Sequence, residues 1–192
     1  MKKIAVFVSG GGTNLQNIID SIERKELNAQ IVLVVASKHG IFAIERAKNA
    51  NIPVSIYEKG EYENLELMYA DLIDELKEKE VEYIILAGYL TILTPNIIRE
   101  YKQKIINIHP SLLPKFGGKG YYGLKVHQAV IDAKEKVSGA TVHFVDEQID
   151  TGDIIDQVEV PVYEYDTPET LQARVLQEEH KLYLKALKKV LK

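Results

Sequence analysis

One stretch near the start of the chain indicates the fold class: Ile4-Ala5-Val6-Phe7-Val8-Ser9-Gly10-Gly11-Gly12-Thr13-Asn14. Its first five residues form a continuous apolar run, which is typical of a strand buried on both faces. The run ends in a glycine-rich turn, after which apolar residues recur at helical spacing, at positions 15, 18, 19 and 22. A strand, a tight turn and a helix in this order predict the first unit of a doubly wound α/β fold.

Later apolar runs continue this alternation. We expect strands at 31–36, 54–57, 81–86 and 105–108, and helices at 41–51, 65–76, 95–101 and 124–133. Two further strands, at about 137–146 and 154–162, are separated by a short acidic turn, which predicts an antiparallel pair. A threonine N-cap and a proline at 167–168 then begin a last helix. The expected fold is Rossmann-like, a mostly parallel twisted sheet with flanking helices and an antiparallel C-terminal strand pair.

Length and composition restrict the class of protein. A chain of 192 residues with 46% hydrophobic and 27% charged residues predicts a single globular domain spanning 1–192. A net charge of −4 does not favour nucleic-acid binding, and the lack of cysteine excludes disulfides and thiolate catalysis. Because Met1-Lys2-Lys3 leads directly into the first strand, we expect no signal peptide or membrane span and a cytoplasmic protein.

The glycine-rich turn allows several interpretations. Leu15 stands where a dinucleotide fingerprint needs its third glycine, and Ser37-Lys38 replaces the acidic residue that would bind ribose. A single phosphate, held by the amides of Gly12, Thr13 and Asn14 and by the Thr13 hydroxyl, fits better. The turn could also bind nothing, with Thr13 or Asn14 only capping the helix.

Polar side chains follow two of the later strands. The first is in Asn107-Ile108-His109-Pro110-Ser111-Leu112-Leu113-Pro114, and the second is in Asp150-Thr151-Gly152-Asp153. The prolines stiffen the first segment, and Leu113–Pro114 is a candidate cis peptide bond. Open α/β sheets bind ligands at the carboxyl ends of their strands. An amide, an imidazole and a carboxylate gathered there, from Asn107, His109 and Asp150, could stabilise an oxyanion and transfer protons, although loop Asn and Asp are often structural.

Metal binding is the weaker alternative. The histidines have no HExxH or comparable spacing, and the acidic turn at 146–153 lacks the glycine and glutamate offsets of a calcium loop. His143 lies within an expected strand and could equally be a hydrogen-bonded core residue. The segment 116–123, with four glycines, predicts a mobile or ligand-approaching loop.

Together these motifs resemble the folate-dependent formyltransferase family. The resemblance is carried by the 107–114 block, by Gly139-Ala140-Thr141-Val142-His143-Phe144-Val145, by Asp150-Thr151-Gly152, and by the opening Ser9-Gly10-x-Gly12-Thr13-Asn14. Within the family it points to members whose formyl acceptor is glycinamide ribonucleotide. It implies 10-formyltetrahydrofolate as co-substrate, a place in de novo purine synthesis, a monomer or weak homodimer, and no metal, nucleic acid or membrane.

Sister enzymes and a non-catalytic protein are the alternatives. A methionyl-tRNA formyltransferase is expected to carry an additional C-terminal domain, and a formyltetrahydrofolate hydrolase a preceding regulatory domain. A nucleotide-binding sensor without catalysis would need the glycine-rich turn but not Asn107, His109 and Asp150 together.

The resemblance also implies roles. Asn107 would donate a hydrogen bond to the formyl oxygen, His109 would donate to that oxygen or move protons, and Asp150 would orient His109 and raise its pKa above about 6.5.

Substrate-binding residues are likewise implied by the resemblance. The half at about 1–100 would bind nucleotide phosphate through Gly12, Thr13 and Asn14, and the half at about 101–192 would be catalytic and face the folate. Glu179 would bind the ribose or glycinamide. The pterin would be recognised by the loop Tyr89, Leu90, Thr91, Ile92 and Leu93, in which Thr91 stands where some relatives have arginine.

Overall fold

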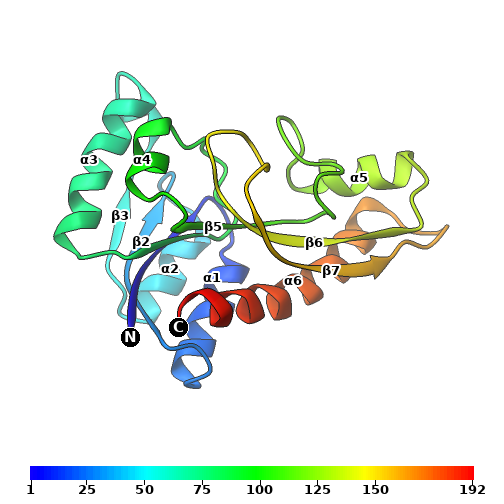
Figure 1. Ribbon diagram of the computed structural model, residues 1–192, viewed down its shortest axis with the longest axis horizontal. Helices are drawn as coiled ribbons and strands as arrows, with labels where there is room; N and C mark the ends of the chain where they lie inside the picture. The colour runs from blue at the N-terminus through cyan, green and yellow to red at the C-terminus, as the bar shows by residue number, and fades with distance from the viewer. The chain divides into compact units, whose positions relative to one another are not determined.

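The computed structural model describes all 192 residues and contains a seven-stranded sheet (Figure 1). In chain order the elements are β1 (Lys2–Val8), α1 (Thr13–Glu23), β2 (Ala29–Ala36), α2 (Phe42–Asn49), β3 (Val54–Ile56), the 3₁₀ helix η1 (Lys59–Glu61), α3 (Leu65–Glu78), β4 (Tyr83–Leu86), α4 (Pro95–Glu100), β5 (Ile105–His109), α5 (Leu124–Asp132), β6 (Val137–Phe144), β7 (Ile154–Pro161) and α6 (Pro168–Val190). The strand order is β3-β2-β1-β4-β5-β6-β7. The predicted Rossmann-like class is confirmed.

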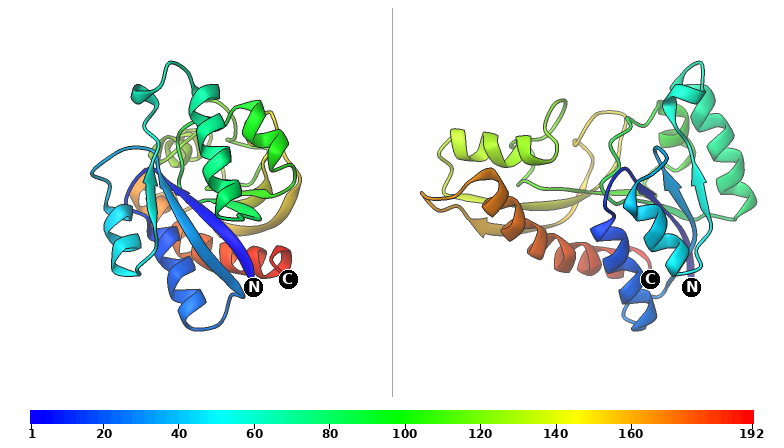
Figure 2. Two further views of the ribbon diagram at one scale, coloured as in Figure 1. Left: turned by 90° about the vertical axis from the view of Figure 1, so that its left-hand side faces the viewer. Right: turned by 180° about the vertical axis from the view of Figure 1, so that it is seen from behind.

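The chain divides into two compact units. The first comprises residues 1–106 and 188–192, and the second comprises 107–187. In the first unit β1 pairs in parallel with both β2 and β4, and β2 pairs in parallel with β3. Residues 4–8 of β1 are fully buried, because helices cover both faces of this sheet: α1 and α2 lie on one side, and α3 and α4 on the other (Figure 2).

Two helix ends explain why α2 ends before the expected residue 51 and β4 begins after the expected residue 81. Asn51 and Glu80 adopt left-handed conformations (φ 55° for each), and the residue after each donates its amide back to the last turn of the preceding helix. Ile52 bonds the Ala47 carbonyl and Val81 bonds the Leu76 carbonyl, both at 2.9 Å. Val81 therefore belongs to the helix cap, and β4 begins at Tyr83.

The second unit contains the antiparallel pair β6 and β7, as predicted. Gly139 allows the two strands to approach, because a Cβ there would lie 1.9 Å from the Val158 carbonyl oxygen. Asp166, just before α6, accepts two 2.7 Å hydrogen bonds from Arg174. The backbone amides of Thr167 and Thr170 each donate to the hydroxyl oxygen of the other residue. No helix combines the length and the apolarity needed to cross a membrane.

Candidate functional site

Asn107, His109 and Asp150 lie together in the second unit. Asn107 and His109 are at the carboxyl end of β5, and Asp150 is in the turn between β6 and β7. His109 Nδ1 lies 3.5 Å from Asp150 Oδ2, and both side chains are about nine-tenths buried or more. The structure therefore brings together the three residues that the sequence singled out. The Leu113–Pro114 peptide bond is cis, as expected.

The ring of His109 is fixed at its other nitrogen. Nε2 lies 2.8 Å from the carbonyl oxygen of Phe116, and because a carbonyl only accepts hydrogen bonds, Nε2 must carry the proton. Phe116 has a positive φ of 53°, which is a strained conformation for a bulky residue. Strain of this kind is commonly found where a backbone group is aimed at a functional side chain.

Asp150 connects two histidines. Its Oδ2 accepts a 2.9 Å hydrogen bond from the Gly118 amide, and its Oδ1 lies 3.6 Å from His143 Nε2. Burial by itself would raise the pKa of this carboxyl. The interaction with His143, the charge of His109 and the Gly118 amide outweigh that effect and lower the pKa below its usual value. Asp150 is therefore ionised at neutral pH.

The expected rise in the pKa of His109 is wrong, because the structure lowers this pKa. Burial lowers the pKa of this 5% exposed imidazole, and that effect exceeds the opposing attraction of Asp150 and the hydrogen bond to Phe116. The charge of the nearby His143 lowers it further. A nearby carboxylate gives a net rise in a histidine pKa only when its attraction exceeds the cost of burying the charged ring. His109 is consequently neutral at rest, with Asp150 placed to stabilise a proton that it takes up.

Two further histidines belong to this neighbourhood. His143 contacts both Asn107 and Asp150. His127, on α5, is 1% exposed; its Nδ1 has no hydrogen-bond partner, and its pKa is lowered to about 4 by burial and then by the charge of His109. From the sequence, His143 stands in the 139–145 block that carries the resemblance, but its role is left open between a site residue and a core residue. His127 is part of no motif, and its only signal is its position within a largely apolar helix.

The glycine-rich turn lies in the first unit and is oriented by α2. The Gly10 carbonyl accepts from the Ala43 amide at 3.1 Å, and the Gly11 carbonyl accepts from Arg46 Nε at 2.7 Å. In a trans peptide the C=O and the following N–H point in opposite directions. The amides of Gly11 and Gly12 are therefore directed away from α2, and successive amides of this kind form an anion-binding concavity.

Gly12 is the N-cap of α1. It has a left-handed φ of 73°, and no side chain caps the helix. The first turn of α1 therefore adds its own backbone donors and its dipole to the same end of the turn. The alternative in which Thr13 or Asn14 is the helix cap does not describe the structure.

The loop 89–93 follows β4, the parallel neighbour of β1, so it leaves the sheet at the same edge as the glycine-rich turn. The Leu90 amide donates to Ser9 Oγ at 2.9 Å, and Tyr89 packs its ring edge-on against Phe7. Leu90 and Ile92 are 63% and 58% exposed, whereas Thr91 and Leu93 are partly buried. An anchored loop with two solvent-facing aliphatic side chains is suited to an aromatic ligand.

Glu179 is only 9% exposed on α6, in the second unit. Its negative charge contributes, after burial, to raising the pKa of Tyr183 one turn later. An ionised carboxylate only accepts hydrogen bonds, so this side chain is suited to hydroxyl or amine donors.

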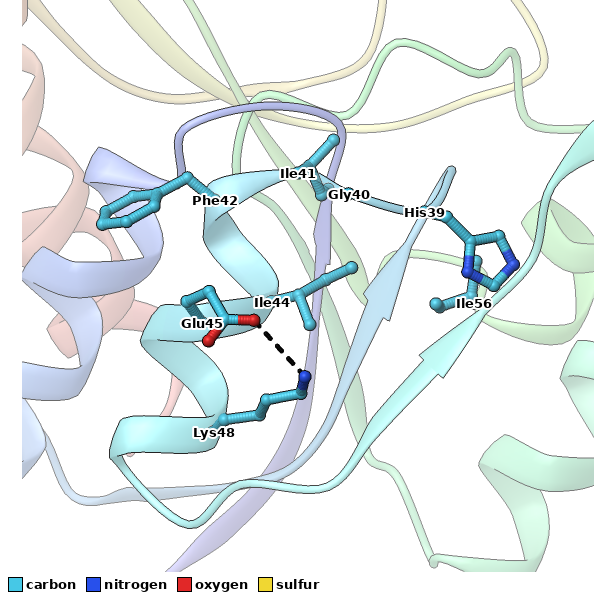
Figure 3. A pocket seen from close by; sticks show the side chains of 8 residues that line it. All are labelled: His39, Gly40, Ile41, Phe42, Ile44, Glu45, Lys48 and Ile56. Atoms are coloured by element: carbon cyan, nitrogen blue, oxygen red, sulfur yellow. Dashed lines mark hydrogen bonds and ion pairs between the residues drawn. The ribbon is translucent and has the colours of Figure 1, made fainter.

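A separate pocket of about 390 Å³ lies beside α2 (Figure 3). Its lining includes Ile41, Phe42 and Ile44 and the Glu45–Lys48 ion pair, but none of the residues predicted to bind substrate. At its rim, His39 belongs to a cluster with Glu58 and Glu61 whose ligand atoms lie within 4.8 Å of one another. His39 and Glu61 are exposed, so water already solvates these groups.

Comparisons with known proteins find similar sequences and structures over nearly the whole chain. The model of the family described as formyl transferase matches residues 2–187. The chain is 41% identical to the phosphoribosylglycinamide formyltransferase of Bacillus subtilis, covering 100% of this chain and 95% of that one. It is 47% identical to the chloroplastic phosphoribosylglycinamide formyltransferase of Vigna unguiculata, which covers 97% of this chain, but it spans only 60% of that relative's length. The crystal structure of glycinamide ribonucleotide transformylase 1 from Geobacillus kaustophilus superposes with a TM-score of 0.94 at 38% identity, over 100% of both chains.

Proposed function

Because this chain belongs to the formyl transferase family, we propose that it transfers the formyl group of 10-formyltetrahydrofolate to the amine of glycinamide ribonucleotide. The products are formylglycinamide ribonucleotide and tetrahydrofolate, in de novo purine synthesis. The observation that carries the proposal is the buried cluster of Asn107, His109 and Asp150, in which an ionised carboxylate faces a neutral imidazole at 3.5 Å.

The reaction needs two kinds of assistance. A neutral amine attacks the formyl carbon, so negative charge develops on the formyl oxygen and positive charge on the nitrogen. Hydrogen-bond donors aimed at that oxygen in a site without bulk water are commonly worth about 3–4 kcal/mol each. A positioned acid–base group adds about 10²–10⁴ in rate. No covalent intermediate with the protein is required.

Each member of the cluster supplies one of these functions. The amide of Asn107 donates to the formyl oxygen. His109 donates a hydrogen bond from Nε2, which is directed to the Phe116 carbonyl in the free protein and to the formyl oxygen in the complex, and the proton stays on Nε2. When the amine has attacked, its proton is taken up at the bare Nδ1 of His109, directly or through a water, and Asp150 lowers the free energy of the imidazolium that forms. The tetrahedral intermediate then collapses, the bond from the formyl carbon to N10 of the folate breaks, and that proton passes to N10, which leaves as tetrahydrofolate.

The other predicted residues bind the substrates. The phosphate of the nucleotide is held by the amides of Gly12, Thr13 and Asn14 and by the Thr13 hydroxyl, a role supported by the direction of the glycine amides. The buried carboxylate of Glu179 binds the ribose or glycinamide. The loop 89–93 recognises the pterin through its backbone, with its exposed aliphatic side chains against the folate.

A steady-state assay tests this function. Purified protein is given 10-formyltetrahydrofolate with and without glycinamide ribonucleotide, and tetrahydrofolate formation is followed. We expect turnover only with the nucleotide. Equal turnover without it would identify a hydrolase, and no turnover in either case would exclude both reactions.

A variant pair then tests the cluster. Asp150→Asn removes the charge but keeps the backbone, because Asn tolerates the φ of 58° at this position. We expect kcat to fall about 10²–10⁴-fold with little change in the KM of the nucleotide. Asp146→Asn makes the same chemical change in the same turn, at an exposed carboxylate that bonds Gln148 and Thr151. A folded Asp150→Asn protein with turnover close to that of Asp146→Asn would contradict the mechanism.

A further inference from the structure

His143 has hydrogen-bond partners on both sides of its ring, and one of them is Asn107. We infer that His143 is a positioning residue, which fixes the amide of Asn107 with its NH₂ group turned toward the imidazole. The inference deepens the proposed function, because it assigns how the amide donor of the cluster obtains its orientation.

The tautomer of His143 follows from the atoms around it. Nδ1 lies 2.8 Å from the carbonyl oxygen of Phe144, which only accepts, so Nδ1 carries the proton. In a neutral imidazole the other nitrogen is then a bare acceptor. Nε2 of His143 therefore presents a lone pair to whatever faces it.

Two groups face this atom. Asp150 Oδ1 lies 3.6 Å away, beyond hydrogen-bond distance, and the closer group is a donor. Asn107 Nδ2 lies 3.2 Å from His143 Nε2, so one amide hydrogen is bound by the ring. The carbonyl oxygen of the amide is thereby turned away from the ring, and the second amide hydrogen stays available to a substrate oxygen. Were the ring proton on Nε2, two donors would meet, and the amide would have to turn over and present its oxygen to the ring. The tautomer of His143 thus decides which atoms Asn107 offers.

The backbone around His143 is arranged to hold this tautomer. The register between β6 and β7 shifts between Val142 and His143, and such irregularities re-aim a side chain relative to a regular strand. The Phe144 carbonyl is closely approached by Gly152, where a Cβ would lie 1.9 Å from the oxygen. The Phe144 amide in turn bonds the Asp153 carbonyl at 2.9 Å. The acceptor that fixes Nδ1 is therefore held by the turn that also carries Asp150.

Two substitutions separate positioning from simple packing. His143→Asn places its amide nitrogen near Nδ1, so it keeps a donor for the Phe144 carbonyl but loses the acceptor for Asn107. His143→Gln reaches the Nε2 position and keeps an acceptor for Asn107, but loses the anchor to Phe144. If His143 positions Asn107, His143→Gln should preserve activity and His143→Asn should not. If only the packing of the ring against Phe144 matters, His143→Asn should preserve activity at least as well as His143→Gln.

We expect His143→Asn to lower kcat about 100-fold with both KM values changed less than about 3-fold, and His143→Gln to stay within about 3-fold of the unmodified enzyme. Thermal unfolding of each variant shows whether it is folded, and rates are normalised to folded protein. A kcat for His143→Asn equal to or above that of His143→Gln would overturn the inference.

A second measurement does not depend on turnover. In ¹⁵N-labelled protein, imidazole nitrogen shifts and couplings report which ring nitrogen of His143 carries the proton. We expect a protonated Nδ1 and a bare Nε2; a protonated Nε2 would overturn the inference. If the unmodified protein has no formyltransferase activity, the proposed function fails while this measurement still decides the orientation of Asn107. If activity is present and Nε2 is protonated, the positioning role alone fails.

Discussion

The buried imidazole of His127 predicts a loss of stability in acid that one substitution should reduce. The pKa of His127 is lowered to about 4, whereas an unfolded histidine titrates near 6.5. Between these values the unfolded chain binds a proton that the folded chain excludes, so stability falls as pH falls from about 6.5 toward 4. The shift of about 2.5 units limits the total loss to about 3.4 kcal/mol.

The two pKa values also give the loss of unfolding free energy over a pH range that can be measured. Between about pH 7.5 and about pH 5, protonation of the unfolded state lowers the free energy of unfolding by about 2 kcal/mol. His127→Leu removes the titrating group with little change in volume. It also costs no hydrogen bond at Nδ1, because that atom has no partner. We therefore expect the variant to retain about 2 kcal/mol more of its neutral-pH stability at pH 5 than the unmodified protein does.

Urea unfolding followed by circular dichroism at both pH values measures this difference. His39→Leu is the matched control, since it removes a histidine whose side chain is 65% exposed. The control should keep the full acid sensitivity. If His127→Leu loses as much stability between the two pH values as the control, His127 is protonated in the folded protein and the reasoning from burial is refuted.

The remaining predictions concern other parts of the chain. Gly12→Ala should raise the KM of the nucleotide far more than that of the folate, and should lower the free energy of unfolding by about 1–3 kcal/mol, because φ is 73° and the new Cβ would lie 2.7 Å from Ala43 Cβ. Gly10→Ala is the control, since its new Cβ would meet nothing within 4 Å. Equal changes in the two KM values would count against the phosphate site. Asp166→Asn should lower the free energy of unfolding by about 2 kcal/mol at neutral pH by removing the charged hydrogen bonds to Arg174. Because Arg174 holds the pKa of Asp166 below its usual value, that contribution is present above about pH 4 and disappears only in stronger acid. Equal free energies of unfolding for the variant and the unmodified protein at neutral pH would contradict this prediction. Backbone amides at 116–123 should exchange with deuterium more slowly when both substrates are bound. Identical exchange rates in the free and bound protein would show that this loop does not close over the substrates.

Local patterns in the sequence determined most of the fold. The buried run at 4–8, the glycine-rich turn and the helical spacing that follows are each visible within a dozen residues, since strand burial and helix amphipathicity repeat with fixed periods. The antiparallel pair and the proline at the start of α6 were likewise local signals. Helix and strand ends shifted where Asn51 and Glu80 adopt left-handed conformations. Asparagine is a known residue for such a helix end, but glutamate is not, so the end at Glu80 is set by its surroundings and not by its residue type.

The candidate site was only partly visible in this way. Asn107, His109 and Asp150 stood out because of the prolines, the turn and the resemblance to a family, and the tertiary structure brings them together. The direction of the His109 pKa, the bond from His109 to Phe116 and the contact of His143 with Asn107 did not stand out. Burial and hydrogen-bond partners are set by residues up to about forty positions away along the chain, as for His109 and Asp150. A residue type names the chemistry that a side chain can perform, but the solvation and the neighbours that decide its protonation exist only once the chain has folded.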